Sequence, residues 1–184
     1  MTTIELRRLA LADLLAIEEI ERRSYPTPWS RSMFAGELAK PSSICLGAFE
    51  AEGEEGALVG YLIVSRYVDA WHVMNVAVDP EHRGRGVATM LLERLFDLTA
   101  DDARRGYTLE VRVSNDKAIS LYERLGFRSR GLRRGYYTDN REDALIMWKD
   151  PVAARGSAAG TSSRFPRRVP SVRHMINASS PLSW

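Results

Sequence analysis

The sequence predicts a mixed α/β domain in which a central βαβ unit carries an anion-binding loop. Three features support this prediction. An apolar, β-branched run over residues 70–78 ends at the turn dipeptide Asp79-Pro80. A short basic loop with two glycines follows it. An amphipathic helix comes next, and its expected buried face consists of Val87, Leu91, Leu95 and Leu98.

The first half of the chain is predicted to supply two helices and three further strands. Residues 4–9 should form a strand, and residues 11–23 a helix whose apolar face is Leu14, Ile17 and Ile20. Two prolines within residues 25–29 cannot continue a helix, so we expect a loop there, and Ser30 can cap a second helix reaching about residue 40. Residues 44–50 and 58–67 should pair as a hairpin around a turn at 52–56.

The second half is predicted to complete the sheet. The anion loop is followed by a helix to about residue 101, and residues 108–113 alternate as a strand with Thr108, Glu110 and Arg112 on one side. Ser114-Asn115-Asp116 can cap a helix that ends at Gly126. Residues 127–137 and 143–149 should be two closing strands. The order β-α-α-β-β-β-α-β-α-β-β is that of a mixed α/β sheet.

Composition limits the class of protein. The 184 residues are 45% hydrophobic, which is enough for a core, and no apolar run approaches the length of a membrane span. The first residues lack a signal-peptide pattern, and the single cysteine excludes an internal disulfide, which together favour a cytoplasmic protein. No metal site is expected, because the histidines are scattered without ligand spacing at positions 72, 82 and 174.

Charge divides the chain into two parts. Residues 1–150 hold 21 Lys and Arg against 24 Asp and Glu, a balance of −3. Residues 151–184 hold five arginines and no acid, and they are rich in Ser, Ala and Pro. We therefore expect a domain over 1–150 and a basic, disordered tail over 151–184. The tail is either an inert extension or a contact to nucleic acid or another acidic surface.

The loop after Asp79 has the chemistry of a phosphate site. Unpaired N–H groups and the dipole at a helix N-terminus attract anions. Gly84 and Gly86 let the backbone approach a phosphate, and Arg83 and Arg85 supply charge. The loop is neither a P-loop nor a complete G-x-G-x-x-G motif. An ordinary strand–turn–helix with a basic surface loop is the alternative.

Four segments resemble one family of enzymes. The loop Arg83-Gly84-Arg85-Gly86-Val87-Ala88 is similar to the acetyl-CoA loop of the GNAT superfamily of acetyltransferases, and residues 107–127 resemble its L-E-V-R-x-x-N…A-x-x-L-Y-x-x-x-G-F signature. Pro28-Trp29-Ser30 and residues 133–147, with R-R-x-Y-Y and R-E-D-A, resemble the RimI group. The match covers residues 4–149 in order. It implies a twisted, mostly antiparallel sheet with helices on both faces, and acetylation of protein N-termini, the type substrate being the N-terminal alanine of a small-subunit ribosomal protein.

The resemblance also implies which residues bind acetyl-CoA. Residues 76–78 would bind the pantetheine arm through their backbone, as in strand addition, and one N–H could polarise the thioester carbonyl. Asn115 would contact the cofactor, although a helix cap alone explains it. The implied cofactor-binding residues are Val76, Ala77, Val78, Arg83, Gly84, Arg85, Gly86, Val87, Ala88, Thr89 and Asn115.

Two residues are implied as catalytic. An α-amine with a pKa of roughly 7.7–8.0 must lose a proton before it attacks a thioester, and the departing thiolate benefits from a proton donor. The resemblance assigns Glu110 as the general base, directly or through water, and Tyr122 as the general acid. Without it, Glu110 would be a rim carboxylate paired with Arg112, and Tyr122 a core aromatic on the stripe that begins at Ala118.

Several alternatives remain open. Cys45 is a nucleophile in principle, but its apolar strand favours a buried structural thiol. Substrate recognition is expected at the loop 25–29 and the region 133–137, unless these are only a packed proline loop and an aromatic strand pair. The function could instead be acetylation of a small amine, or CoA binding without catalysis. We expect a protein N-terminus as partner, no membrane, and a monomer.

Overall fold

The computed structural model describes residues 3–51, 56–102 and 105–151. Seven strands lie in these ranges: β1 (Ile4–Arg8), β2 (Ser43–Glu50), β3 (Ala57–Arg66), β4 (Ala70–Val78), β5 (Gly106–Arg112), β6 (Arg128–Arg133) and β7 (Ala144–Lys149). The helices are α1 (Leu14–Ser24), α2 (Arg31–Ala39), α3 (Val87–Leu98) and α4 (Asp116–Arg124), with short 3-10 turns at Leu11–Asp13 and Pro80–His82. The tail expected over residues 151–184 lies, beyond Pro151, outside the described residues.

The strands form one sheet in the order β1-β2-β3-β4-β5-β7-β6. Every neighbouring pair is antiparallel except β4 and β5, which are parallel because α3 connects them as a crossover. The predicted mixed, mostly antiparallel sheet with a central βαβ unit is therefore confirmed.

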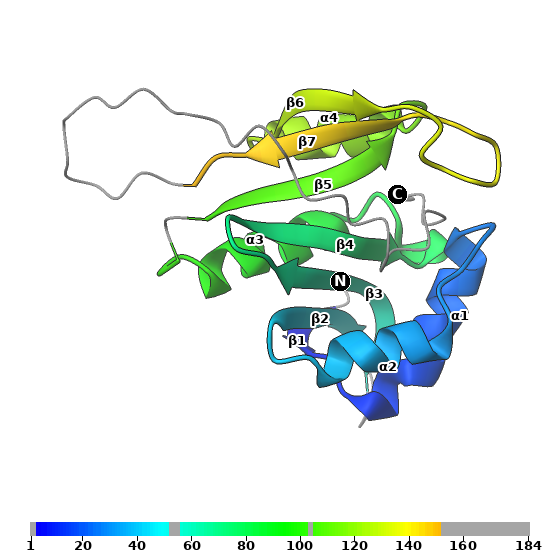
Figure 1. Ribbon diagram of the computed structural model, residues 1–184. Helices are drawn as coiled ribbons and strands as arrows, with labels where there is room; N and C mark the ends of the chain where they lie inside the picture. Colours follow the sequence, from blue (N-terminus) through cyan, green and yellow to red (C-terminus); the bar gives the residue numbers. More distant parts are fainter. Residues whose placement is uncertain (1–2, 52–55, 103–104, 152–184) are drawn as a thin grey trace.

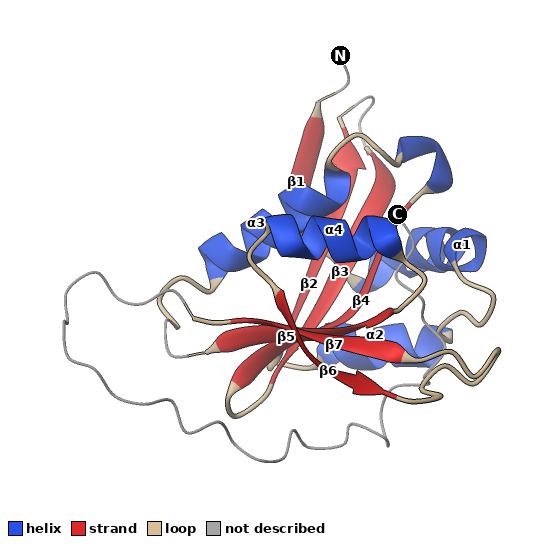
Figure 2. Cartoon of the chain, turned by 90° about the horizontal axis from the view of Figure 1, so that it is seen from above, coloured by secondary structure: helices blue, strands red, loops and turns tan. Residues whose placement is uncertain are grey.

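Helices cover both faces of the sheet (Figure 2). One core packs α3 and α4 against the sheet through Leu91, Leu95 and Leu121, and the other packs α1 and α2 through Ile17, Ile20 and Phe34. Because side chains alternate along a strand, each strand residue belongs to one of these two faces. This alternation decides on which side of the sheet every functional side chain lies.

The boundaries differ from the prediction at two helices and one strand. The helix expected at residue 11 begins with a 3-10 turn, and the helix expected to reach residue 101 ends at Leu98. Leu98, predicted to be buried, is 40% exposed, because the next residue, Thr99, turns inward and donates to the Leu95 carbonyl. The strand predicted over 127–137 ends at Arg133, where a turn with Gly135 at φ 56° begins.

The parallel pair β4–β5 separates soon after it begins. Its ladder comprises only three pairs, of which His72 with Thr108 is the last. Beyond it β4 runs on to Val78 and β5 to Arg112, and the two strands diverge (Figure 1). The sheet thus opens in its middle, and a strand-like molecule could pair with the backbone there. We call this opening the splay.

No helix of the described residues is long and apolar enough to cross a membrane.

Candidate active site

The predicted phosphate loop has the backbone of an anion site. Gly84 and Gly86 adopt φ of 75° and 80°, which L side chains rarely reach, and a Cβ added at either would meet no protein atom within 4 Å. Gly86 is the N-cap of α3 and leaves that helix without a side-chain cap. The N-terminal N–H groups of α3 therefore receive no hydrogen bond acceptor from the N-cap side chain, and this helix end can bind an anion.

A cavity of about 560 Å³ opens beside this loop. Seven of the predicted cofactor-binding residues line it, namely Val78, Arg83, Gly84, Gly86, Val87, Ala88 and Thr89. The other lining residues are His82, Lys117, Leu121 and Arg124. The cavity combines an apolar wall with cations from two segments, which fits a phosphate-bearing molecule such as acetyl-CoA.

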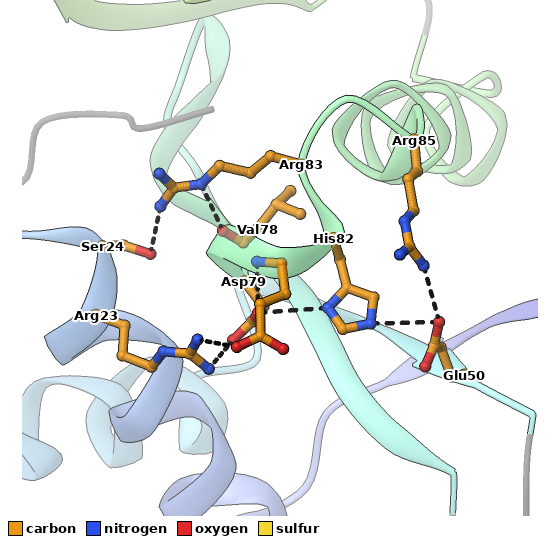
Figure 3. A network of polar contacts seen from close by, with 9 residues as sticks. Arg23, Ser24, Glu50, Val78, Asp79, His82, Arg83 and Arg85 are labelled. Carbon is orange, nitrogen blue, oxygen red and sulfur yellow. Dashed lines mark hydrogen bonds and ion pairs between the residues drawn. The ribbon is translucent and has the colours of Figure 1, made fainter.

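The two arginines of the loop differ in their contacts (Figure 3). Arg83 lines the cavity while its guanidinium donates to the Val78 carbonyl at 3.1 Å and to Ser24 Oγ at 3.2 Å. Arg85 lies outside the lining and forms an ion pair with Glu50 at 3.4 Å. The charge that we expected from Arg85 is therefore partly neutralised, and its contact with a cofactor stays a prediction.

Two cations that were not predicted from the sequence also line the cavity. Lys117 and Arg124 lie on α4 with Leu121 between them, so the spacing of four and three residues puts them on one face of that helix. The same spacing is readable in the sequence, but nothing there says which face of α4 meets the loop. Both cations line the cavity beside the phosphate loop and can supply counter-charges to an anion there.

Glu110 lies at the centre of a buried ionic cluster. Its side chain is 6% exposed, with Oε2 2.9 Å from His72 Nε2 and Oε1 3.2 Å from Arg133 Nη2. Burial alone would raise the pKa of Glu110, but the hydrogen bond and charge of His72 and the charge of Arg133 outweigh it and lower that pKa. The sequence analysis did not connect His72 with Glu110.

The alternative that pairs Glu110 with Arg112 is wrong. Arg112 forms ion pairs with Asp139 at 2.8 Å and with Glu142 at 3.0 Å, and its guanidinium lies 3.8 Å from the ring centre of Tyr137. The loop that follows β6 is the reason, because it brings these partners to the end of β5. Arg112 thereby anchors the segment that carries Tyr136 and Tyr137.

Tyr122 lies on the other side of the sheet from Glu110. It projects from α4 into the core formed with α3, whereas Glu110 alternates with Leu109 and Val111, which belong to that same core. Burial, followed by Tyr137, raises the pKa of Tyr122 well above its ordinary value. Its hydroxyl is therefore protonated at neutral pH, as a general acid requires.

The loop predicted to recognise substrate is fixed by a buried carboxylate. Glu21 of α1 accepts hydrogen bonds from the Trp29 backbone N–H at 2.8 Å and from the Tyr61 hydroxyl. Tyr25, in the same loop, donates from its hydroxyl to the Val76 carbonyl at 2.5 Å. The loop therefore reaches the part of β4 that borders the splay.

The remaining predicted residues have simple structural roles. Asn115 accepts from the Ala118 N–H at 3.1 Å and caps α4, while Val76 and Ala77 are fully buried in β4. Cys45 is buried, and burial, with a contribution from Glu37, raises the pKa of its thiol to about 12. No group of three or more His, Cys, Asp and Glu side chains in the described ranges could hold a metal ion.

Comparison with known proteins agrees with this geometry. A sequence model of the acetyltransferase (GNAT) family matches residues 14–127. The chain is 37% identical over 150 residues to the [ribosomal protein bS18]-alanine N-acetyltransferase of Salmonella typhimurium, which covers 80% of this chain and 96% of the relative. It is 38% identical over 149 residues to the N-alpha-acetyltransferase RimI of Mycobacterium tuberculosis, with 77% and 89% covered.

A solved structure gives the same picture. The crystal structure of the ribosomal-protein-S18-alanine N-acetyltransferase from Escherichia coli superposes with a TM-score of 0.75 and 34% identity, covering 86% of this chain and all of that one. The resemblance read from the sequence motifs is thereby confirmed. The chain belongs to the acetyltransferase (GNAT) family and is an N-acetyltransferase of the RimI type.

Proposed function

We propose that this protein transfers the acetyl group of acetyl-CoA to the N-terminal α-amino group of a protein, by direct attack within a ternary complex. The substrate we favour is the N-terminal alanine of a small-subunit ribosomal protein. Relatives of 37% identity carry this activity in their names, and the P-W-S loop and the R-E-D-A segment are part of the same likeness.

The observation that carries the proposal is that Glu110 and Tyr122 lie on opposite faces of the sheet, with Glu110 on β5 beyond the last pair of the β4–β5 ladder. A thioester bound along β4 in the splay would expose its carbonyl carbon to an amine from the Glu110 side. Its sulfur would lie toward α4, where Tyr122 can donate a proton. The general base and the general acid thus lie on opposite sides of the sheet. The base meets only the amine, and the acid meets only the departing thiolate.

The basic cavity supplies the binding energy for the rest of the cosubstrate. We assign the phosphates of acetyl-CoA to the N-terminus of α3, with Arg83, Lys117 and Arg124 as counter-charges. The two left-handed glycines support this assignment, since a ligand can approach their backbone without meeting a side chain. When bound, acetyl-CoA supplies the activated acetyl group.

The test is acetylation of a defined set of acceptors. Purified protein and acetyl-CoA are incubated with a peptide that begins with alanine and holds an internal lysine, with the same peptide already acetylated at its N-terminus, and with spermidine. We expect an acetyl group on the α-amine of the first peptide only, located by fragmentation mass spectrometry. Transfer to spermidine alone would favour a small-molecule enzyme, and binding of acetyl-CoA without any transfer would favour a CoA-binding module.

The domain division is part of the proposal. We infer that residues 1–150 suffice for transfer to a short peptide, because β4, β5, α3 and α4 lie within them. A chain shortened after Asp150 should keep the kcat of the full chain in the same assay. Failure of the shortened chain to fold would contradict this inference. A cytoplasmic location, suggested by the single cysteine, belongs to the same proposal.

A further inference from the structure

Three consecutive residues at the C-terminal end of α1 are bonded to the end of β4 and to the loop after it. We call these residues, Arg23, Ser24 and Tyr25, the α1 clamp. Arg23 forms an ion pair with Asp79 at 2.6 Å (Figure 3) and another with Glu81 at 2.8 Å. Asp79 directly follows β4, so this contact fixes the end of the helix to the end of the strand.

Ser24 is joined to β4 through the phosphate loop. Arg83 donates from Nη2 to Ser24 Oγ at 3.2 Å and from Nε to the Val78 carbonyl at 3.1 Å (Figure 3). The same arginine lines the cavity that we assign to acetyl-CoA. An anion that binds this guanidinium therefore acts on a side chain that already holds the end of α1.

Tyr25 reaches β4 directly. Its hydroxyl donates to the Val76 carbonyl at 2.5 Å, and the residue is only 4% exposed, so the bond is shielded from water. Tyr25 is also the first residue of the loop 25–29, where we expect substrate recognition. The loop thus begins at a residue that is held by the strand proposed to bind the thioester.

The two carbonyls that accept these bonds face the splay. The Asp79 N–H donates to the Val59 carbonyl of β3 at 2.9 Å, so the backbone groups of Asp79 point to β3. Along a strand these groups alternate between its two edges, so those of Val78 and Val76 point away from β3 and toward β5. The ladder with β5 ends at His72, and the splay therefore opens onto this edge of β4.

A ligand on this edge shares its contacts with the α1 clamp. The N–H and the carbonyl of Val76 point to the same edge, so a thioester carbonyl bound by that N–H restrains the residue that Tyr25 holds by its carbonyl. Phosphates at Arg83 restrain Ser24 in the same way. Both ends of acetyl-CoA therefore reduce the freedom of the residues from which the loop 25–29 starts.

We propose that the α1 clamp positions the loop 25–29 for the acceptor in response to acetyl-CoA; this rests on the proposed acetyl transfer. Tyr25 and Ser24 are positioning residues, because they reach the cosubstrate through Val76 and Arg83. A ligand that orders the loop spares the next ligand that entropic cost, so the cosubstrate and the acceptor bind with positive coupling. Couplings between two sites are typically about 5–150-fold in affinity, and we expect about tenfold here.

Calorimetry on the full chain measures this coupling as a ratio of two Kd values. The Kd of a peptide that begins with alanine is determined alone and with a saturating acetyl-CoA analogue in which a methylene group replaces the thioester sulfur, so that no transfer occurs. The wild type should bind the peptide about tenfold more tightly with the analogue.

Two variants should weaken the coupling. Tyr25→Phe removes only the hydroxyl, and the loss of one hydrogen bond should lower the ratio to about twofold. Ser24→Ala, at a partly exposed position, should by itself lower the ratio to about threefold. With both changes together, the Kd of the peptide should no longer depend on the analogue.

Tyr107→Phe is the matched control. Tyr107 is 6% exposed, and its hydroxyl bonds to Thr99 on the other face of the sheet, away from the α1 clamp. This variant loses the same group as Tyr25→Phe but should keep the tenfold ratio.

Steady-state kinetics separate positioning from loss of folded enzyme. At saturating acetyl-CoA, Tyr25→Phe should raise the KM of the peptide about fivefold and leave kcat within about twofold of the wild type, because affinity in the ternary complex is what the hydroxyl supports. A variant that is merely less stable loses active enzyme, which lowers the apparent kcat and leaves KM unchanged.

Hydrogen exchange tests the α1 clamp without any acceptor. Acetyl-CoA alone should slow the exchange of backbone amides within residues 25–29 in the wild type and in Tyr107→Phe, but not in Tyr25→Phe. Equal coupling and equal protection in Tyr25→Phe and the wild type would overturn the proposal, as would their absence from the wild type. If no amine is acetylated, the proposed function fails, while the response of the loop to acetyl-CoA still decides for or against the α1 clamp.

Discussion

The phosphate loop and the Glu110 cluster are two parts of one site that are built in opposite ways. The loop consists of consecutive residues, and its geometry is that of the backbone at Gly84 and Gly86. The cluster joins side chains from three strands, His72 of β4, Glu110 of β5 and Arg133 of β6, which are separated by 38 and 23 positions in the chain. The anion loop thus depends on local backbone, whereas the Glu110 cluster depends on long-range packing.

This difference predicts how each part responds to change. The loop binds mainly through its backbone, so its folding should tolerate most substitutions, and acetyl-CoA affinity should be sensitive to changes at its glycines and at Arg83. The cluster is buried, and each member holds another, so a single replacement leaves a charge without its partner. The predictions below separate the two parts by asking whether a change affects turnover, folding or cofactor affinity.

The largest effect is expected for Glu110→Gln, which keeps the shape of the side chain but removes its charge. Turnover should fall by about 10²–10⁴-fold at pH 7, because a glutamine cannot take the amine's proton as the Glu110 carboxylate is proposed to do. The loss should shrink above pH 8, where more of the amine is neutral. Steady-state kinetics on a peptide that begins with alanine measures the effect, and calorimetry should show unchanged acetyl-CoA affinity. Equal losses of turnover and affinity would mean that Glu110 belongs to the binding part of the site.

Tyr122→Phe should give the next largest effect, a fall in kcat of about 10²-fold or more, because only the hydroxyl that protonates the thiolate is removed. The ring packs against Phe127 with 5.5 Å between centres, so the core is preserved. Calorimetry should again report normal cofactor affinity. A wild-type kcat would remove Tyr122 from the mechanism and leave it the core aromatic that its spacing suggests.

Arg112→Met should lower stability rather than chemistry. Removing one partner of a buried ion pair costs about 3–5 kcal/mol, and we expect about 2–3 kcal/mol here because Asp139 and Glu142 are partly exposed. Arg134→Met, an exposed arginine two residues before Tyr136, should stay within about 0.5 kcal/mol of the wild type. Urea unfolding at pH 7 measures both, and equal losses would contradict the anchoring role of Arg112.

The ion pair between Arg112 and Glu142 should also make the free energy of unfolding depend on pH, and the sign follows from the pKa of Glu142. Burial raises the pKa of Glu142, but hydrogen bonds from Ser114, Asn140 and Arg112 outweigh it and lower that pKa from 4.5 to about 2. A lowered folded-state pKa contributes stability that is complete above pH 4.5 and is lost as pH falls through about 2. The stability difference between wild type and Arg112→Met should therefore shrink over that interval.

The phosphate loop and the Glu110 cluster also differ in how much of each could be predicted from the sequence. The loop, the strand before it and the α3 face from Val87 to Leu95 follow from local periodicity and turn chemistry, and the structure confirms the fold they predict. The ion pairs of Glu110 cannot be predicted from local patterns. Arg112 lies on the same side of the strand, yet it pairs with Asp139 and Glu142 in the loop after β6. His72 was set aside as a scattered histidine for the same reason. Sheet order and register, which no local pattern contains, bring these side chains together.

Gly86→Ala should affect binding modestly and turnover only through binding. Its φ of 80° makes any side chain strained by about 1 kcal/mol, and the new methyl group would enter the open space beside the cavity. We expect acetyl-CoA affinity to fall about tenfold, which is about 1.4 kcal/mol. Gly36→Ala is the control, since it adds the same methyl group inside α2 with no neighbour within 4 Å and should stabilise the helix. Unchanged affinity in Gly86→Ala would remove the loop from the cofactor site.

The smallest effect is expected for Cys45→Ala. Cys45 lies in β2, on the face under α1 and α2, and burial raises the pKa of its thiol to about 12, so almost no thiolate exists at neutral pH. Turnover should stay within about twofold of the wild type, and stability should fall by about 1 kcal/mol for the smaller side chain. Initial rates at varied acetyl-CoA and peptide should give intersecting lines, as direct transfer in a ternary complex requires. Parallel lines, or an acetyl group found on Cys45 by mass spectrometry, would show a covalent intermediate and would move the chemistry from the Glu110 cluster to the thiol.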